Sequence, residues 1–328
     1  MTVQQTKSVN EIGFPKFGIQ FRNFPKTTAD SLFDKIAEVS HEAERAGYDS
    51  LWTIDHLMLC PPISYESQPI PDAWTALVQI ANETTSVDIG TLVTSSLFRS
   101  AEYLAKLSEA LYLISSGRLQ VGIGGGWFEQ EFRAYGIPFP SPMQRLAMVE
   151  NQVKYLRKYF RSLGQDLTKD GMPLASSPPI WIGGSGPRLT LKLAAKIADA
   201  CNLFGNPKTV QERLELLELY CRKFSRDPKE IIKSKHSNVV IGRSKAEVEK
   251  KLAEIVPERS KWKEFSTSNI VGTARECVES LRKYILVGVE YFTLNFPDLF
   301  EIDPLKLFMT DVVGALKEME ISASGEQM

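Results

Sequence analysis

The sequence has few cysteines, few histidines and no excess of either charge. Its 328 residues carry 39 lysines and arginines against 40 aspartates and glutamates, a formal net charge of −1. Long-range attraction to a polyanion is therefore weak, and we do not expect a nucleic-acid partner. The cysteines lack CxxC spacing, which predicts reduced thiols in a cytoplasmic protein rather than disulfides or a zinc site. They are Cys60, Cys201, Cys221 and Cys277.

Long apolar runs are also lacking. No window approaches 18 consecutive apolar residues, and the first thirteen residues contain no apolar segment of the kind found in signal peptides. We therefore expect neither a membrane helix nor a signal peptide. The sequence has no HExxH motif and no His/Cys cluster, so no metal site is expected. The hydrophobic content of 43% is nevertheless enough for a large core.

Short apolar, β-rich runs alternate with longer segments of helical period along most of the chain. The first helical segment, 28–46, has apolar residues three or four apart and ends at Gly47. Such alternation is typical of βα units with a parallel sheet. Strands are expected at 17–21, 50–54, 87–94, 119–123, 180–182, 200–203, 236–241 and 291–295. Eight strands favour an α/β fold of the (β/α)8 TIM barrel type over an open sheet of five or six strands.

The boundaries of the domain follow from this alternation. We predict a single barrel domain over residues 17–320, with flexible polar tails at 1–16 and 321–328. Two segments, 57–71 and 251–273, resemble insertions in the strand-to-helix loops and are expected to build the substrate pocket. Active sites of such barrels lie at the carboxyl ends of the strands. Residues that directly follow a strand are therefore the functional candidates.

Asp55 and His56 follow the second predicted strand. Imidazole exchanges protons near neutral pH, so His56 at this place is a candidate proton donor or acceptor. The alternative is an aspartate cap beside a solvated histidine. His41 lies among glutamates in a helix and is expected on the surface, whereas His236 begins a strand and is either a core or a site residue.

A glycine-rich run follows the fifth strand. Gly183 to Gly186 contain one hydroxyl, Ser185, and precede Pro187, a residue that suits the first turn of a helix. Close backbone approach and free N–H groups predict a phosphate cradle, to which Arg188 adds a cation. An ordinary tight turn is the alternative. A serine nucleophile is not expected, because Pro187 replaces the last glycine of GxSxG.

A second glycine run, Gly124 to Gly126, follows the fourth strand and is succeeded by Trp127. Trp127 stands where the third glycine of a dinucleotide fingerprint would be, so a Rossmann site is not expected. We interpret the run as a place where a flat ring lies against the backbone, with Trp127 as one wall. A tight turn again is the alternative.

Taken together, these motifs resemble the bacterial luciferase-like superfamily of flavin and deazaflavin enzymes. The resemblance extends over about residues 17 to 300 in the family's order and rests on the segments 55–56, 90–99, 116–127 and 180–187. The segment 126–140 is most similar to the coenzyme F420-dependent oxidoreductase branch, which is methylenetetrahydromethanopterin reductase-like. FMN-dependent monooxygenases share the same barrel.

The resemblance implies hydride transfer between coenzyme F420 and a small organic substrate. It places Asp55 and His56 at the edge of the deazaflavin ring as catalytic residues, and a non-prolyl cis peptide bond between Leu92 and Val93 behind that ring. The implied cofactor-binding residues form the pocket floor and walls or hold the phosphate: they are Thr91, Leu92, Val93, Gly124, Gly125, Gly126, Trp127, Gly183, Gly184, Ser185 and Gly186. No metal is implied.

One position departs from the branch. Its sugar-phosphate dehydrogenases have a glutamate directly after the glycine run, where this chain has Trp127, and neither Glu129 nor Glu131 matches that position. Three interpretations stay open: an F420-dependent oxidoreductase, an FMN-dependent monooxygenase supplied by a flavin reductase, and a non-catalytic flavin-binding barrel. Members of the family usually form dimers, so the resemblance implies a homodimer.

Overall fold

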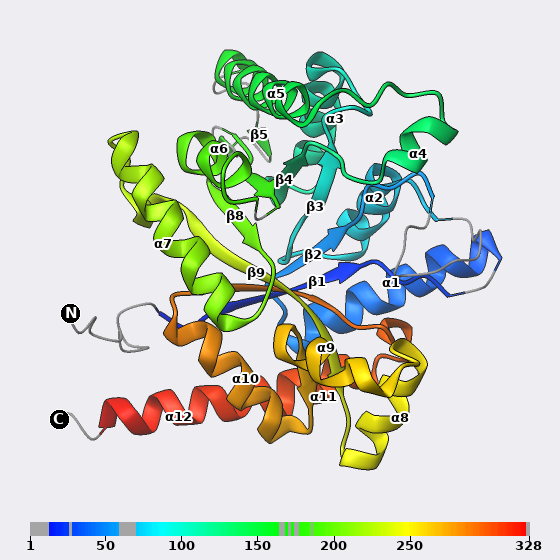
Figure 1. Cartoon of the computed structure of the whole chain (residues 1–328). Coiled ribbons are helices and arrows are strands. Elements are labelled where there is room, and N and C mark those ends of the chain that lie inside the picture. The colour runs from blue at the N-terminus through cyan, green and yellow to red at the C-terminus, as the bar shows by residue number, and fades with distance from the viewer. Residues whose placement is uncertain are drawn as a thin grey trace.

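The computed structural model describes residues 13–25, 28–58, 70–163, 168–169, 172–173, 177–184 and 186–325. Eight parallel strands form a closed barrel surrounded by helices (Figure 1). In their order around the barrel they are β1 (Lys16–Phe21), β2 (Ser50–Thr53), β3 (Asp88–Ser95), β4 (Leu119–Gly124), β7 (Ile180–Gly183), β8 (Ala200–Leu203), β9 (Ile232–Ile241) and β11 (Tyr291–Asn295). The pairing of β11 with β1 closes the ring, which confirms the predicted (β/α)8 barrel.

The helices occupy the connections between these strands. The long ones are α1 (Ala29–Ala46), α2 (Ala73–Glu83), α3 (Ala101–Ile114), α5 (Pro142–Leu163), α6 (Thr190–Ile197), α7 (Pro207–Lys223), α8 (Lys245–Ile255), α10 (Ala274–Leu286) and α12 (Gly314–Gly325). Local sequence explains their ends. Gly47 closes α1 at a φ of 92°, which favours glycine, and the Ser100 side chain accepts a hydrogen bond from the backbone N–H of Tyr103 at the start of α3.

Shorter elements decorate the barrel. These are α4 (Glu129–Ala134), α9 (Trp262–Ser268), α11 (Asp303–Leu307), the antiparallel pair β5 (Thr168–Lys169) and β6 (Met172–Pro173), and β10 (Ile270–Gly272). The expected insertion 251–273 contributes α9 and β10, which pack with α8 against the outer part of β9 (Figure 1). Most of the other expected insertion, residues 59–69, lies outside the described residues, as does Cys60.

Three differences from the sequence-based expectations concern the bounds and form of helices. The helix after β7 begins at Thr190 rather than Pro187, because the N–H of Leu191 bonds to the carbonyl of Gly186 and makes a wider first turn. The last helical segment contains a π-helical stretch, Phe308–Val313, between α11 and α12. Helix α12 continues to Gly325, beyond the expected domain end at residue 320.

Large aromatic side chains fill the barrel near the strand starts. Trp52 and Trp181 have ring centroids 4.6 Å apart, and Tyr291 packs against Trp181 at 5.0 Å. Ser50 Oγ lies 2.6 Å from the Tyr291 hydroxyl and 2.5 Å from the Trp52 indole nitrogen. Gly90 makes room for this packing, since a Cβ there would meet the Trp52 ring at 2.8 Å. The lower barrel is thus solid, and open space is left toward the carboxyl ends of the strands.

Three cysteines, Cys201, Cys221 and Cys277, are buried and free of disulfides. Among the described helices, none is long and apolar enough to cross a membrane.

Candidate active site

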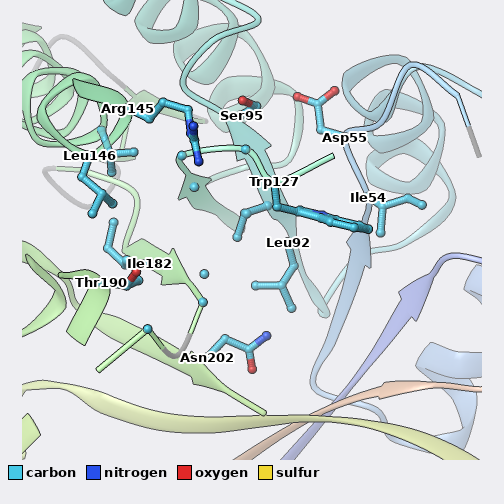
Figure 2. A pocket seen from close by; sticks show the side chains of 18 of the residues that line it. Ile54, Asp55, Leu92, Ser95, Trp127, Arg145, Leu146, Ile182, Thr190 and Asn202 are labelled. Carbon is cyan, nitrogen blue, oxygen red and sulfur yellow. The ribbon is translucent and has the colours of Figure 1, made fainter. Parts of the chain in front are cut away.

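A cavity of about 700 Å³ lies at the carboxyl ends of the barrel strands (Figure 2). Its lining comes from seven of the eight strands or from the residues that follow them, so it is the place where barrel enzymes bind ligands. The described part of the insertion 251–273 contributes nothing to this lining, which corrects the expectation that it builds the pocket. That segment packs on the outer part of β9 instead.

The floor of the cavity is apolar and flat. Leu92 and Val93 line it, and the peptide bond between them is cis, as the resemblance implies. The Gln20 amide donates a 2.6 Å hydrogen bond to the carbonyl of Leu92. Gly124 and Gly183 flank Val93 so closely that a Cβ at either would meet its methyl groups at 2.7 Å. The two glycines therefore leave room for the Val93 side chain within this apolar floor.

The expected phosphate cradle forms one end of the cavity. Gly184, Gly186, Arg188 and Thr190 line it together, whereas Ser185 lies outside the described residues. Gly184 has a φ of 108°, a conformation that other residues rarely adopt. The turn leads into α6, whose amino end has no side-chain cap and carries a partial positive charge suited to an anion.

His56 is held by a buried glutamate from α4. Its Nδ1 lies 3.0 Å from Oε2 and 3.2 Å from Oε1 of Glu131, whose side chain is only 1% exposed. The backbone N–H groups of Leu57 and Met58 also donate to Oε1 of Glu131, at 2.6 and 3.2 Å. Since a carboxylate only accepts hydrogen bonds, Nδ1 of His56 carries the hydrogen of this pair. The ring is thereby fixed in one orientation at the cavity wall.

The short helix α4 was not expected from the sequence, because six residues give too little apolar periodicity. This helix places the two nearby glutamates in different surroundings. Glu131 faces inward to His56, whereas Glu129 is exposed and bonds to Arg133 at 2.7 Å. The i,i+4 pairing of opposite charges was the one local signal of a helix here.

Asp55 lines the cavity, but its carboxylate is used within the protein. Arg99 donates to it at 2.5 Å, and the Thr94 hydroxyl donates to the same oxygen. Burial raises the pKa of Asp55, while Arg99 and Thr94 act in the opposite direction. Figure 2 shows the carboxylate pointing away from the cavity centre. The arrangement suits a structural ion pair that fixes the strand end next to His56.

Of two further residues predicted to bind the cofactor, Trp127 lines the cavity and Thr91 does not. Trp127 extends across the cavity in Figure 2, 59% exposed, with its ring centroid 6.0 Å from that of His56. Thr91 does not line the cavity: it is fully buried, and its hydroxyl donates to the carbonyl of Gly122 at 2.9 Å. It joins β3 to β4 and reaches the floor only through the backbone of its neighbour Leu92.

Polar residues at β1, β8 and β9 also line the cavity. Arg22 and Asn202 were not expected there from the sequence, whereas His236 was expected to be either a core or a site residue. Asn202 of β8 and His236 of β9 line the cavity together with Arg22, which follows β1. Burial, Arg22 and Lys235 keep the pKa of His236 well below its ordinary value. Residues 233–238 of β9 are all polar, whereas strands of a parallel barrel are usually apolar, and this polar run was a usable signal. No group of three or more His, Cys, Asp or Glu suited to a metal occurs in the described parts of the chain.

Comparison with known proteins places these features in a family. The profile of the luciferase-like monooxygenases matches residues 17–291. The chain is 29% identical over 226 residues to 5,10-methylenetetrahydromethanopterin reductase of Methanolobus tindarius, a match that covers 66% of this chain and 62% of that relative's length.

Solved structures agree with the fold. An F420-dependent secondary alcohol dehydrogenase in complex with an F420-acetone adduct superposes with a TM-score of 0.72 and 20% identity, covering 91% of this chain and 98% of the other. The FMN-bound oxygenating constituent of 3,6-diketocamphane monooxygenase from Pseudomonas putida does so with a TM-score of 0.72 and 14% identity, covering 92% and 98%. The profile matches most of the chain, and the structure has the barrel expected of the family. The chain therefore belongs to the luciferase-like monooxygenase family.

Proposed function

We propose that this protein is an F420-dependent oxidoreductase that transfers a hydride between the deazaflavin cofactor and a small organic substrate. The observation that carries the proposal is a single cavity in which a flat apolar floor, a glycine-rich turn and an oriented histidine lie together. Support for F420 over FMN comes from the similarity to an F420-dependent glucose-6-phosphate dehydrogenase of Amycolatopsis mediterranei, 27% identical over 174 residues, and from the segment 126–140.

The residues present fit such a cofactor. Gly124 and Gly183 give the Val93 side chain room beside them, because a side chain at either position would collide with it, and Leu92 and Val93 thereby form an apolar floor on which a ring could lie. Gly184, Arg188 and the amino end of α6 would hold the phosphate. When bound, the cofactor would supply the hydride chemistry, and the protein would contribute binding, orientation and a proton path.

The protein's own part centres on His56. Its ring is fixed by Glu131 at the cavity wall, where it would hold or release a proton during the reaction. Trp127 would cover one side of the ligand, and the apolar floor would exclude water from the reacting atoms. Asp55 acts through its ion pair with Arg99 and positions the strand end from which His56 projects.

The oxygen requirement of the reaction tests this proposal. We would incubate the protein with chemically reduced F420 and a panel of carbonyl compounds without oxygen, and follow reoxidation of the cofactor. Oxidation that needs a carbonyl compound and no oxygen is expected. Activity only with reduced FMN and oxygen would instead assign a monooxygenase that depends on a flavin reductase. Association as a homodimer stays a prediction, to be checked by sedimentation.

A further inference from the structure

His236 is a buried polar side chain that faces the cavity without a partner on one ring nitrogen. It is 6% exposed, and its Nε2 has no hydrogen-bond partner among the described residues. Strand β9 places it there, since the pairing of β8 with β9 ends at Lys235 and His236 stands one residue farther toward the rim. A buried ring nitrogen without a partner is costly, so this atom points to a ligand.

The hydrogen bonds around His236 decide which ring nitrogen carries the hydrogen. The Thr293 hydroxyl lies 3.3 Å from Oδ1 of Asn202 and 3.4 Å from Nδ1 of His236. A hydroxyl has one hydrogen, and an amide oxygen only accepts, so Thr293 donates to Asn202. Its oxygen then accepts from Nδ1 of His236. The Nε2 atom is left with a lone pair and is an acceptor.

Asn202 presents the complementary group. Its Oδ1 accepts from the Thr293 hydroxyl and lies 2.9 Å from the Ser234 hydroxyl, whose one hydrogen is shared with the carbonyl of Cys201 at 3.0 Å. The amide nitrogen lies on the other branch of the same side chain, which reaches the cavity in Figure 2. The wall thus offers a donor from Asn202 beside an acceptor from His236, both linked through Thr293.

The surroundings also keep His236 uncharged. Its burial and the nearby cations Arg22 and Lys235 hold the pKa of the imidazole well below its ordinary value. Burial also lowers the pKa of Lys235, to about 7, and its amino group donates to the carbonyls of His236 and Ser268 at 2.8 and 2.7 Å. A neutral acceptor of this kind binds a hydroxyl but is poorly suited to take its proton.

We propose that Asn202 and His236 form the subsite that recognises a hydroxyl group of the substrate. The hydroxyl hydrogen is donated to Nε2 of His236, and the hydroxyl oxygen accepts from the amide of Asn202. The inference rests on the proposed function for the identity of the reaction, and it adds that the substrate carries a hydroxyl group. No proton transfer is assigned to His236.

Imidazole nitrogen NMR on the full chain tests the proposal without any turnover. Only three histidines are present, so ¹⁵N-histidine labelling gives three ring systems that single substitutions assign. At a pH of about 6.5, where an ordinary imidazole is half protonated, we expect His236 to be neutral with hydrogen on Nδ1. A ring protonated on Nε2 would overturn the proposal. Thr293→Val should shift the ring toward a mixture of the two tautomers.

A pair of probes tests recognition itself. Cyclohexanol should move the Nε2 signal of His236 and leave that of the exposed His41 unchanged, whereas cyclohexyl methyl ether, which has no hydroxyl hydrogen, should not. We expect the alcohol to bind roughly three- to tenfold more tightly than the ether, the worth of one hydrogen bond. His236→Phe should abolish that preference. Equal responses to both probes in the unsubstituted protein would contradict the subsite.

The outcomes separate this inference from the proposed function. The titration with cyclohexanol is done with and without F420. An alcohol-specific shift in a protein that binds neither F420 nor FMN would uphold the subsite and refute the oxidoreductase. Tight cofactor binding without an alcohol-specific shift at His236 would refute the subsite alone.

Discussion

Nδ1 of His56 lies 3.0 Å from Oε2 of Glu131, although 75 residues separate the two in the chain. The contact joins the end of β2 to the short helix α4 and buries a carboxylate beside the cavity. Its partners, the ring of His56 and two backbone N–H groups, all come from one loop. Glu131 is therefore the positioning residue of the site.

Glu131→Gln tests that role. The amide keeps the shape but offers an N–H group where a carboxylate oxygen accepted, so His56 should lose its fixed orientation. We expect turnover to fall roughly tenfold to hundredfold, as for other partners that orient a functional histidine, with a changed pH profile and little change in cofactor affinity. Glu129→Gln is the matched control, since Glu129 is exposed and bonds only to Arg133 among the contacts described. Equal losses in both variants would contradict the assignment.

His56→Ala should lower turnover by roughly 10²- to 10⁴-fold, the usual contribution of a positioned acid or base. The fold and most of the cofactor affinity should remain, because the floor and the cradle come from other strands. His41→Ala is the control: its side chain is 53% exposed and pairs with Glu83 at the surface. Rate measurements over a pH range of about 5 to 9 check the prediction. Indistinguishable rates for the two variants would make Asp55 and His56 a capped turn only.

The phosphate cradle predicts a local effect of Gly184→Leu. A side chain here would push the backbone away from the anion and weaken cofactor binding at least tenfold, about 1.4 kcal/mol. Gly136→Leu is the control, because Gly136 also has a positive φ, of 68°, but has open space around it. Both variants bear the strain of a left-handed conformation, so isothermal titration isolates the effect of the cavity. Equal cofactor affinities in the two folded variants would remove the cradle from the site.

Asp55→Asn should affect stability more than chemistry. It leaves the Arg99 guanidinium, whose side chain is 12% exposed, without its buried counter-ion. Removing one partner of a buried pair costs about 3–5 kcal/mol of unfolding free energy. Asp72→Asn should cost less than about 1 kcal/mol, since asparagine also caps a helix and only the exposed ion pair of Asp72 with Arg99 is lost. Urea unfolding measures both, and a stability unchanged in Asp55→Asn would show that the pair does not hold the strand end.

Glu44 gives a prediction for acid stability. Burial raises its pKa, but hydrogen bonds from Ser86, Thr85 and Val87 outweigh this and lower it to about 2. The pKa of a glutamate side chain in an unfolded chain is about 4.3. Its contribution to stability is therefore present above about pH 4.3 and is lost as the pH falls toward 2. The stability difference between wild type and Glu44→Gln should be constant near neutral pH and shrink in that acidic window, and a difference independent of pH would contradict it.

Much of this architecture could be predicted from local sequence. Period-three-and-four apolar spacing with a terminal glycine located α1, and β-rich runs located each barrel strand to within a few residues, except that β9 begins earlier. These signals are local, so they can be recognised without knowledge of the tertiary structure. The glycines beside Val93 were likewise visible, because only glycine allows such close backbone approach.

The pairings within the site were not predictable in the same way. Glu131 and His56 meet only because the loop after β4 folds back over the end of β2. Asp55 was expected at the ring, but its partner Arg99 comes from beyond the end of β3. His236 was undecided because residues 233–238 of its strand are all polar, so local sequence does not show which of them face inward. Only closure of the barrel shows that His236 lines a cavity.

We propose that this barrel binds F420 in preference to FMN. Parallel fluorescence titrations of the purified protein with oxidised F420 and with FMN, in the same buffer, test it most directly. We expect saturable F420 binding at least tenfold tighter than FMN binding, and we expect this preference to be lost in Gly184→Leu but not in Gly136→Leu. Tighter binding of FMN, or no saturable binding of F420, would contradict it.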